Sequence, residues 1–298
     1  MYFYELLRSN NIYFEENIST ASISSIKAGG IANAVVYPKS EDELVKTVVL
    51  LEEAGILYKV IGGCTNTYFS DSGFSGALIS TKRIREITVQ ENGACRLTAG
   101  ISLAGAIRYL ADRNISLGAE LFGIPGSIGG AVRNNAGAFG KTLSDVMLYG
   151  TFFDIPNRET VILDNTELKF SYRYSLLQEK KIIFLGGVFA TERMSSSKIF
   201  EDIEHFIALR RSKQPSYPSL GSFFKRNGDI IPAKLIDAAG LRGFCIGGAS
   251  VSRKHAGFIV NKDHRATSSD ISHLAEYIEE TVKNRYGIDL QREAEFVG

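Results

Sequence analysis

The stretch Gly123–Gly140 constrains this chain more than any other, because six of its eighteen residues are glycine. In a helix or strand interior each glycine would cost about 0.5–1 kcal/mol relative to alanine. Isoleucine, valine, alanine and phenylalanine are interspersed among these glycines. Such side chains require burial, which argues against a flexible loop. We therefore predict a turn whose exposed N–H groups cradle an anionic ligand, assisted by the N-terminus of a following helix.

Composition and charge limit the partners that the chain can bind. Its 298 residues, 44% hydrophobic and 22% charged, suffice for two or three globular domains. With 34 basic and 33 acidic side chains the net charge is +1, so no broad basic field would attract nucleic acid or a membrane surface. We see no signal-peptide pattern and no apolar run approaching the ~20 residues of a membrane helix. We expect a monomer.

The cysteines and histidines form no pattern of a disulfide framework or a metal site. Cys64, Cys95 and Cys245 are odd in number and widely spaced, which indicates a reducing compartment, the cytoplasm. The four histidines include no close pair of the kind that metal sites use. We therefore predict no metal.

Apolar periodicity and turn residues divide the chain into three segments of mixed helix and strand. We predict domains over 1–76, 77–214 and 215–298, with the last boundary at the proline-rich turn Gln214–Pro218. The predicted helices cover 1–9, 40–53, 103–111, 198–211, 233–239 and 269–286. The predicted strands cover 31–37, 58–61, 77–80, 87–90, 96–98, 147–155, 160–163, 182–191 and 256–261.

A second glycine turn, Gly62–Thr67, follows the predicted strand 58–61. Its two glycines would let the main chain turn sharply, while Thr65 and Asn66 add side-chain donors suited to a diphosphate. The pattern is not the G-x-G-x-x-G of dinucleotide-binding folds, and a plain turn is an equal interpretation. Cys64 is interpreted as a small residue in a tight turn, with a reactive thiol or a covalent attachment point as the alternative. Together, two glycine loops some sixty residues apart could hold one long ligand.

Arg173 lies among aromatic and hydroxyl residues in the segment Phe170–Ser175. A guanidinium held rigidly in such surroundings can bind a carboxylate through two hydrogen bonds and stabilise developing negative charge. An arginine on the solvated face of an edge strand is an equal interpretation.

Ser222 follows a glycine and precedes two phenylalanines that would exclude water. The segment has neither a histidine base nor a G-x-S-x-G turn, so a nucleophilic serine is a poor interpretation. A serine that donates a proton in a dry pocket is possible, and a turn serine without chemistry is the default. Near the C-terminus, Glu293 or Glu295 could act as acid or base, or could lie on a solvated strand.

Taken in order, these segments resemble the UDP-N-acetylenolpyruvoylglucosamine reductase family, flavoenzymes of bacterial peptidoglycan synthesis also called UDP-N-acetylmuramate dehydrogenases. The resemblance runs from the turn Ala28–Gly30 to Gly298, and the chain looks like the shorter (type II) subtype. Its most specific parts are Gly123–Gly140, Tyr172–Ser175, Gly221–Lys225 and Gly248–Ala256. Arg226-Asn227, Cys64-Thr65 and Gln291-Arg292 depart from the family pattern and bear on contacts to nucleotide and flavin.

The resemblance implies an α+β fold, with a two-part FAD cradle of the p-cresol-methylhydroxylase type and a C-terminal α/β substrate-binding domain. It implies non-covalent FAD, NADPH as co-substrate, and reduction of the enolpyruvyl ether of UDP-N-acetylglucosamine to UDP-N-acetylmuramate. The positions that match the family's FAD loops are Gly62, Gly63, Cys64, Thr65, Asn66, Thr67, Pro125, Gly126, Ser127, Gly129, Gly130, Ala136 and Gly137.

The family's catalytic positions fall on Arg173, Ser222 and Glu293. The resemblance implies that Arg173 stabilises the enolate-like charge and that Glu293 assists as a protonated donor, which requires a raised pKa. It also implies that Ser222 gives a proton to the carbanion, helped by Lys225 or water. Two alternatives remain open: another flavin-dependent oxidase on the same fold, and a non-catalytic flavin- or nucleotide-binding module.

Overall fold

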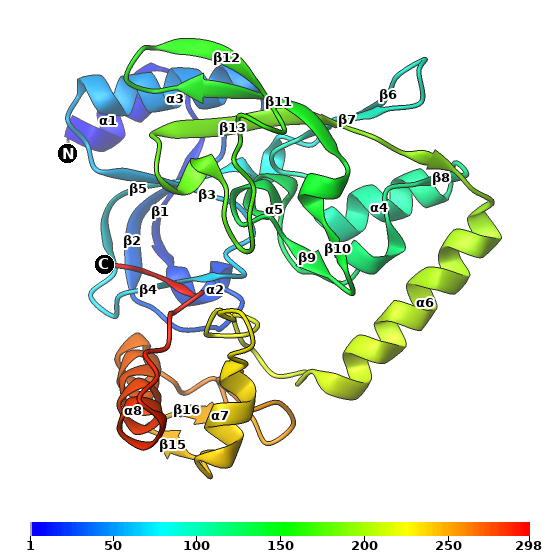
Figure 1. Cartoon of the computed structure of the whole chain (residues 1–298). Helices are drawn as coiled ribbons and strands as arrows, with labels where there is room; N and C mark the ends of the chain where they lie inside the picture. The colour runs from blue at the N-terminus through cyan, green and yellow to red at the C-terminus, as the bar shows by residue number, and fades with distance from the viewer. Residues whose placement is uncertain (1) are drawn as a thin grey trace. The chain divides into compact units, whose positions relative to one another are not determined.

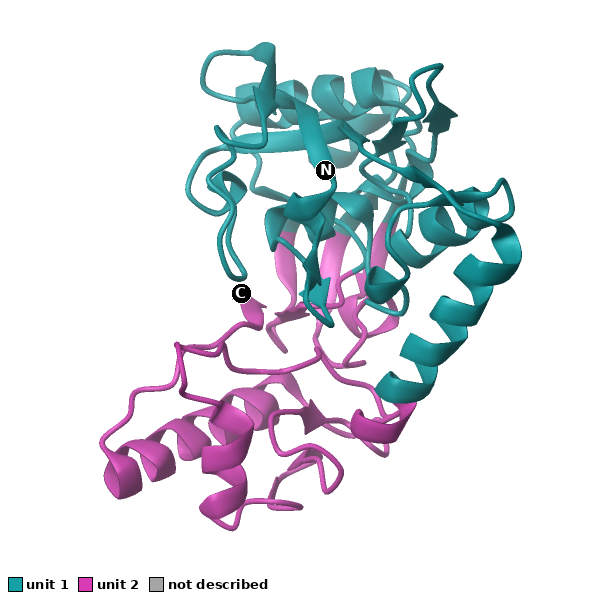
Figure 2. Cartoon of the chain, turned by 45° about the vertical axis from the view of Figure 1, so that its right-hand side comes forward, with its two compact units in different colours: residues 1–15, 34–63, 76–210 teal, residues 16–33, 64–75, 211–298 magenta. Residues whose placement is uncertain are grey.

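The chain forms two compact units in the computed structural model, which describes residues 2–298. Unit 1 comprises residues 1–15, 34–63 and 76–210, and unit 2 comprises residues 16–33, 64–75 and 211–298 (Figure 2). Each unit therefore gathers segments that lie far apart in the sequence. The domain boundaries predicted above remain predictions.

The centre of unit 1 is an antiparallel sheet in the order β12-β11-β13-β7-β6 (Figure 1). Its strands are β6 (Ile87–Val89), β7 (Cys95–Thr98), β11 (Met147–Asp154), β12 (Glu159–Asp164) and β13 (Ile182–Phe189).

Consecutive residues of one strand in this sheet belong to different hydrophobic cores, because successive side chains point to opposite faces of the sheet. Phe152 packs with α4 (Leu103–Ala111), α5 (Ile128–Arg133) and α6 (Ser196–Lys213). Phe153 packs with α3 (Glu41–Glu53). Helices therefore cover both faces.

A second sheet has the order β1-β2-β5-β3, with β3 (Tyr58–Ile61) parallel to β5 (Phe74–Ser80). Strands β1 (Phe14–Ser19), β2 (Ile31–Val36) and β5 contribute residues to both units. Helix α3 begins where Ser40 Oγ accepts a hydrogen bond from the Glu43 N–H, and it buries Leu44, Val48 and Leu51 on one face.

The core of unit 2 lies between a small sheet and α8 (Ser268–Tyr286). Strands β15 (Cys245–Ile246), β16 (Ala249–Val251) and β17 (Ile259–Val260) form the sheet, and α7 (Pro232–Ala238) packs on α8. In the same unit β18 (Glu295–Val297) pairs in parallel with β4 (Thr67–Phe69).

The remaining elements are short. They are α1 (Tyr2–Ser9), α2 (Thr20–Ile23), β8 (Ile115–Ser116), β9 (Gly137–Ala138), β10 (Lys141–Thr142), β14 (Glu192–Arg193) and the 3-10 turns at 81–83, 119–121, 143–145 and 176–178. None of the helices within residues 2–298 is both long and apolar enough to cross a membrane.

The expected α+β class is confirmed, and each predicted helix overlaps an observed one. The structure adds several elements that were not predicted, among them β1, β4 and α5. The predicted strand over 256–261 shortens to β17, because residues 252–258 form a loop closed by hydrogen bonds from Ser252 N to Phe258 O and from Phe258 N to His255 O.

Asp71 anchors the start of α8 within unit 2. Its carboxylate accepts hydrogen bonds from the N–H groups of Ser268 and Ser269, at 2.8 and 2.9 Å, and from Ser269 Oγ at 2.7 Å. Burial alone would raise the pKa of Asp71, but these bonds outweigh burial and hold the pKa below its ordinary range.

We predict that this anchor makes unit 2 acid-sensitive. The folded-state pKa of Asp71 is depressed, so its contribution is complete above the unfolded-state pKa of about 4 and is lost as pH falls through the folded-state value. Asp71→Asn should cost about 1 kcal/mol at pH 7 and much less near pH 3. Urea denaturation of both proteins at the two pH values measures the difference, and an equal cost at both would contradict this role.

Candidate active site

Unit 1 contains a cavity of about 700 Å³ beside β3 and β13, within the 300–1,000 Å³ usual for small-molecule sites. Part of its wall is apolar, formed by Leu51, Ile56, Leu57, Val60, Ile61, Ile155, Leu177, Ile182, Ile183 and Phe184. Another part consists of Gly62, the helix start Ser127–Gly130, and Arg133. An apolar wall that continues into a main-chain wall suits a ligand with a flat ring at one end and a polar linker.

The turn after β3 lies directly against the start of α5. A Cβ atom at Gly62 would lie 2.2 Å from Ser127 Oγ, and one at Gly63 would lie 3.0 Å from the Gly126 Cα. Ser127 Oγ itself accepts a hydrogen bond from the Gly130 N–H at 3.3 Å. Glycine at these positions therefore allows the two segments to lie close together. A flexible loop would not need glycine for this reason.

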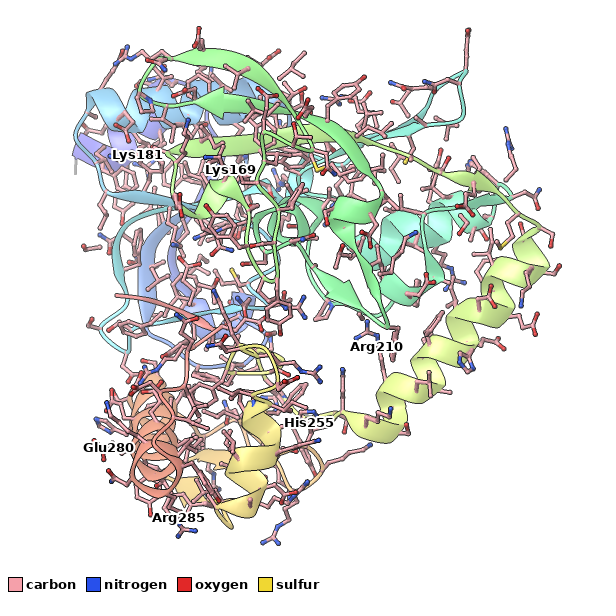
Figure 3. All side chains as sticks on the ribbon, viewed as in Figure 1. Lys169, Lys181, Arg210, His255, Glu280 and Arg285 are labelled. Atoms are coloured by element: carbon pink, nitrogen blue, oxygen red, sulfur yellow. The ribbon has the colours of Figure 1, made fainter. Side chains whose placement is uncertain are left out.

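Basic side chains add positive charge around this cavity. Lys59, Arg133, Lys180 and Lys181 line it, and Arg133 Nη1 donates to the Leu177 carbonyl at 3.3 Å. Lys181, labelled in Figure 3, directly precedes β13. Charge of this sign complements a diphosphate. The cavity thus fits a dinucleotide with an apolar ring system, such as FAD.

The second half of the predicted flavin loop, Cys64–Thr67, belongs to unit 2. Cys64 is buried with a positive φ of 46°, and its carbonyl accepts from the Ser25 N–H at 3.0 Å, as expected of a small residue in a tight turn. Asn66 Nδ2 donates to the Glu293 carbonyl at 2.9 Å, and the Asn66 carbonyl accepts from the Glu295 N–H at 2.8 Å. This loop therefore holds the C-terminal segment.

Arg173 lies in a turn closed by pairing of Ser171 with Tyr174, so the alternative of an edge strand is wrong. Its φ of 55° is left-handed, which breaks any strand at this point. Its Nη2 donates to the Gly137 carbonyl at 3.2 Å, and its guanidinium carbon lies 5.2 Å from the centre of the Tyr172 ring. The turn thus fixes the guanidinium beside the glycine-rich stretch.

Arg210 is a second guanidinium at this stretch, and the sequence analysis missed it. Its Nε and Nη2 donate to the carbonyls of Phe122 and Glu120 at 3.1 and 3.3 Å, and it lies over the Phe139 ring at 5.1 Å. Figure 3 labels it on α6. Burial, followed by repulsion from Arg173, lowers the pKa of Arg210. Unit 1 therefore concentrates positive charge here.

The segments that carry Ser222 and Glu293 are hydrogen-bonded to each other in unit 2. Glu293 N–H donates to the Phe223 carbonyl at 2.8 Å, and Phe223 N–H donates to the Gly257 carbonyl at 2.8 Å. Phe223 and Phe224 are buried in the core, whereas Ser222 is exposed, so the expected dry setting for this hydroxyl is not found within unit 2. The phenylalanines stabilise the core and leave the serine at its surface.

Comparison with known proteins identifies the family. Residues 32–164 match the FAD binding domain, and residues 214–297 match the UDP-N-acetylenolpyruvoylglucosamine reductase C-terminal domain. The UDP-N-acetylenolpyruvoylglucosamine reductase of Caldanaerobacter subterraneus subsp. tengcongensis is 39% identical over 99% of this chain and 96% of that protein. This chain belongs to the UDP-N-acetylenolpyruvoylglucosamine reductase family. A relative of the same name from Lactiplantibacillus plantarum is 36% identical over 96% of this chain and 94% of that protein.

Solved structures agree on the fold. UDP-N-acetylenolpyruvylglucosamine reductase from Thermus caldophilus superposes with a TM-score of 0.82 at 24% identity, covering 96% of this chain and all of that one. Glucooligosaccharide oxidase from Acremonium strictum, whose FAD is 6-S-cysteinyl and 8α-N1-histidyl, gives 0.51 at 14% identity, over 94% of this chain and 58% of that one. The expected two-part FAD cradle with an added C-terminal domain is confirmed, and the protein is a flavin-dependent oxidoreductase with FAD as its cofactor.

We predict that Gly62→Ala weakens FAD binding about tenfold, because the new methyl group would displace Ser127 Oγ and break its bond to the Gly130 N–H. Quenching of flavin fluorescence on titration of the apoprotein measures the dissociation constant. Thr160→Ala, at an exposed position of β12, is the control. An unchanged affinity for Gly62→Ala would show that the close approach does not shape the flavin site.

Proposed function

We propose that the protein catalyses NADPH-dependent reduction of the enolpyruvyl ether of UDP-N-acetylglucosamine to UDP-N-acetylmuramate, a step of peptidoglycan precursor synthesis. Full-length relatives with the reductase name support the reaction. The observation that carries the proposal in this chain is the acid–alcohol pair, Glu293 and Ser222, on hydrogen-bonded neighbouring segments of main chain.

FAD, when bound, supplies hydride transfer between NADPH and the enol ether. The close approach of Gly62 and Gly63 to Gly126 and Ser127, together with the basic cavity wall, supports their assignment to the flavin site. The other assigned positions, Cys64, Thr65, Thr67, Pro125, Gly129, Gly130, Ala136 and Gly137, remain part of this proposal, whereas the side chain of Asn66 is bonded to the C-terminal segment.

Arg173 is proposed to hold the carboxylate of the enolpyruvyl group. Its tether to the Gly137 carbonyl fixes the direction of the guanidinium. A guanidinium binds a carboxylate more tightly as negative charge accumulates there, so the interaction strengthens along the reaction. Charge that is already in place requires no rearrangement when the reaction occurs.

Ser222 is proposed to give a proton to the substrate carbon, while Glu293 acts beside it as a protonated donor. A serine hydroxyl is a weak acid, so it must recover its proton from a neighbour as it gives one up. Lys225 lies on the same segment, which is fixed by the bond from Lys225 N–H to the Gln291 carbonyl at 2.8 Å. The exposure of Ser222 also gives water access to it.

We further propose that the enzyme works as a monomer in the cytoplasm. Three free cysteines, Cys64, Cys95 and Cys245, are consistent with a reducing compartment. Among residues 2–298 no group of three histidine, cysteine or acidic side chains could hold a metal ion, and the proposed reaction requires none.

We expect NADPH oxidation by the purified holoenzyme to depend strictly on the enolpyruvyl sugar nucleotide, which absorbance at 340 nm follows. An oxidase on the same fold would instead turn over with oxygen and release peroxide. Flavin that stays with the chain after denaturation would indicate a tether and support that alternative. No turnover with either partner would support a flavin-binding module.

Ser222→Ala should separate the two half-reactions. We expect flavin reduction by NADPH to keep its wild-type rate, while reoxidation by the enolpyruvyl substrate slows by about 10²-fold or more. Stopped-flow absorbance of the flavin measures both. Ser22→Ala, at an exposed serine of α2, is the matched control. Equal loss of both half-reactions would refute a proton-donor role for Ser222.

A further inference from the structure

The C-terminal segment of unit 2 lies between two other segments and is bonded to both. On one side Arg292 pairs with Phe224, flanked by the bonds from Lys225 N–H to the Gln291 carbonyl and from Glu293 N–H to the Phe223 carbonyl, each 2.8 Å long. On the other side β18 pairs with β4. Glu293 therefore lies where the segment passes from one partner to the other.

Asn66 bridges this change of partner. It directly precedes β4, and its side-chain Nδ2 donates to the Glu293 carbonyl at 2.9 Å. Its own carbonyl accepts from the Glu295 N–H at 2.8 Å. The side-chain bond fixes the peptide unit that follows Glu293, and the bond from the Glu293 N–H to the Phe223 carbonyl fixes the one before it. Both peptide planes that flank the Glu293 Cα are thus held.

Arg292 sets the direction in which the next side chain leaves the segment. Its Nε and Nη2 donate to the two carboxylate oxygens of Glu279 on α8, at 2.7 and 2.8 Å. Burial lowers the pKa of Arg292, but the hydrogen bonds to Glu279 outweigh it and raise the pKa overall, so the ion pair holds its charge. Because successive side chains of an extended segment point to opposite faces, anchoring Arg292 on α8 directs Glu293 away from α8.

We propose that Asn66 is a positioning residue for Glu293, which it holds through its side-chain amide. One N–H of the Asn66 amide is directed at the Glu293 carbonyl. The inference rests on the proposed function, in which the Glu293 carboxyl acts beside Ser222. A displacement of a reacting group by about 1 Å can cost about 10²-fold in rate, so one lost tether is enough to be measured.

The test compares Asn66→Ala and Asn66→Asp with the wild-type holoenzyme. Both remove the donor to Glu293, and Asn66→Asp preserves the size of the side chain, so it keeps the test valid if Asn66→Ala fails to fold. We expect the FAD dissociation constant and the rate of flavin reduction by NADPH to stay within about twofold of wild type. Reoxidation by the enolpyruvyl substrate should slow about tenfold, and its pH profile should shift. Asn284→Ala, at an exposed asparagine of α8, is the matched control.

A double-mutant cycle with Glu293→Gln separates the two proposals. If Asn66 acts through Glu293, Asn66→Ala should add little to the loss caused by Glu293→Gln. A tenfold or greater rise in the FAD dissociation constant, or slower reduction by NADPH, would overturn the positioning role and make Asn66 a cofactor ligand. Full additivity, or wild-type reoxidation in Asn66→Asp, would also overturn it. If wild-type flavin is not reoxidised by the substrate at all, the proposed function fails first.

Discussion

The close approach of two main-chain turns in unit 1 is the constraint on which the flavin site depends. Strand β3 ends at Ile61 and α5 begins at Ile128. Between these ends, a Cβ at Gly62 would lie 2.2 Å from Ser127 Oγ, so the turn has no room for a larger residue there. Helix α5 cannot move away, because Ile128 and Val132 are buried against the five-stranded sheet. The packing of β3 on one side and of α5 on the other therefore explains why the turn between them contains glycine.

Elements with local signals could be predicted from the sequence, and elements that depend on distant partners could not. Helix α4 has the predicted bounds, because a serine cap and a run of apolar residues define it locally. Helix α5 lies in a glycine-rich stretch with poor helix propensity and is stabilised by tertiary packing and the Ser127 cap. Strand β4 has three residues and pairs with a strand more than 220 positions later, which no local pattern encodes.

The same distinction explains which site residues the sequence revealed. Arg173 could be identified from its neighbours, although the left-handed conformation of Lys169 and Arg173 turns an apparent strand into a loop. Arg210 could not, because on a helix it resembles any solvent-facing arginine. Its role is defined by carbonyl groups at Phe122 and Glu120, about ninety residues earlier. The exposure of Ser222 was likewise hidden, since the burial of Phe223 and Phe224 says nothing about which way the residue before them faces.

The way in which Arg173 and Arg210 are tethered suits the chemistry of an anionic substrate. Both guanidinium groups donate to main-chain carbonyls, and a neutral carbonyl orients a cation without the opposite charge that a carboxylate would bring. Bringing two such groups together is unfavourable, and the lowered pKa of Arg210 reflects burial and this repulsion. Arginine nevertheless stays protonated under these conditions. In the proposed reaction, a substrate carboxylate bound here would relieve a repulsion already present in the folded protein, and growing negative charge would relieve it further.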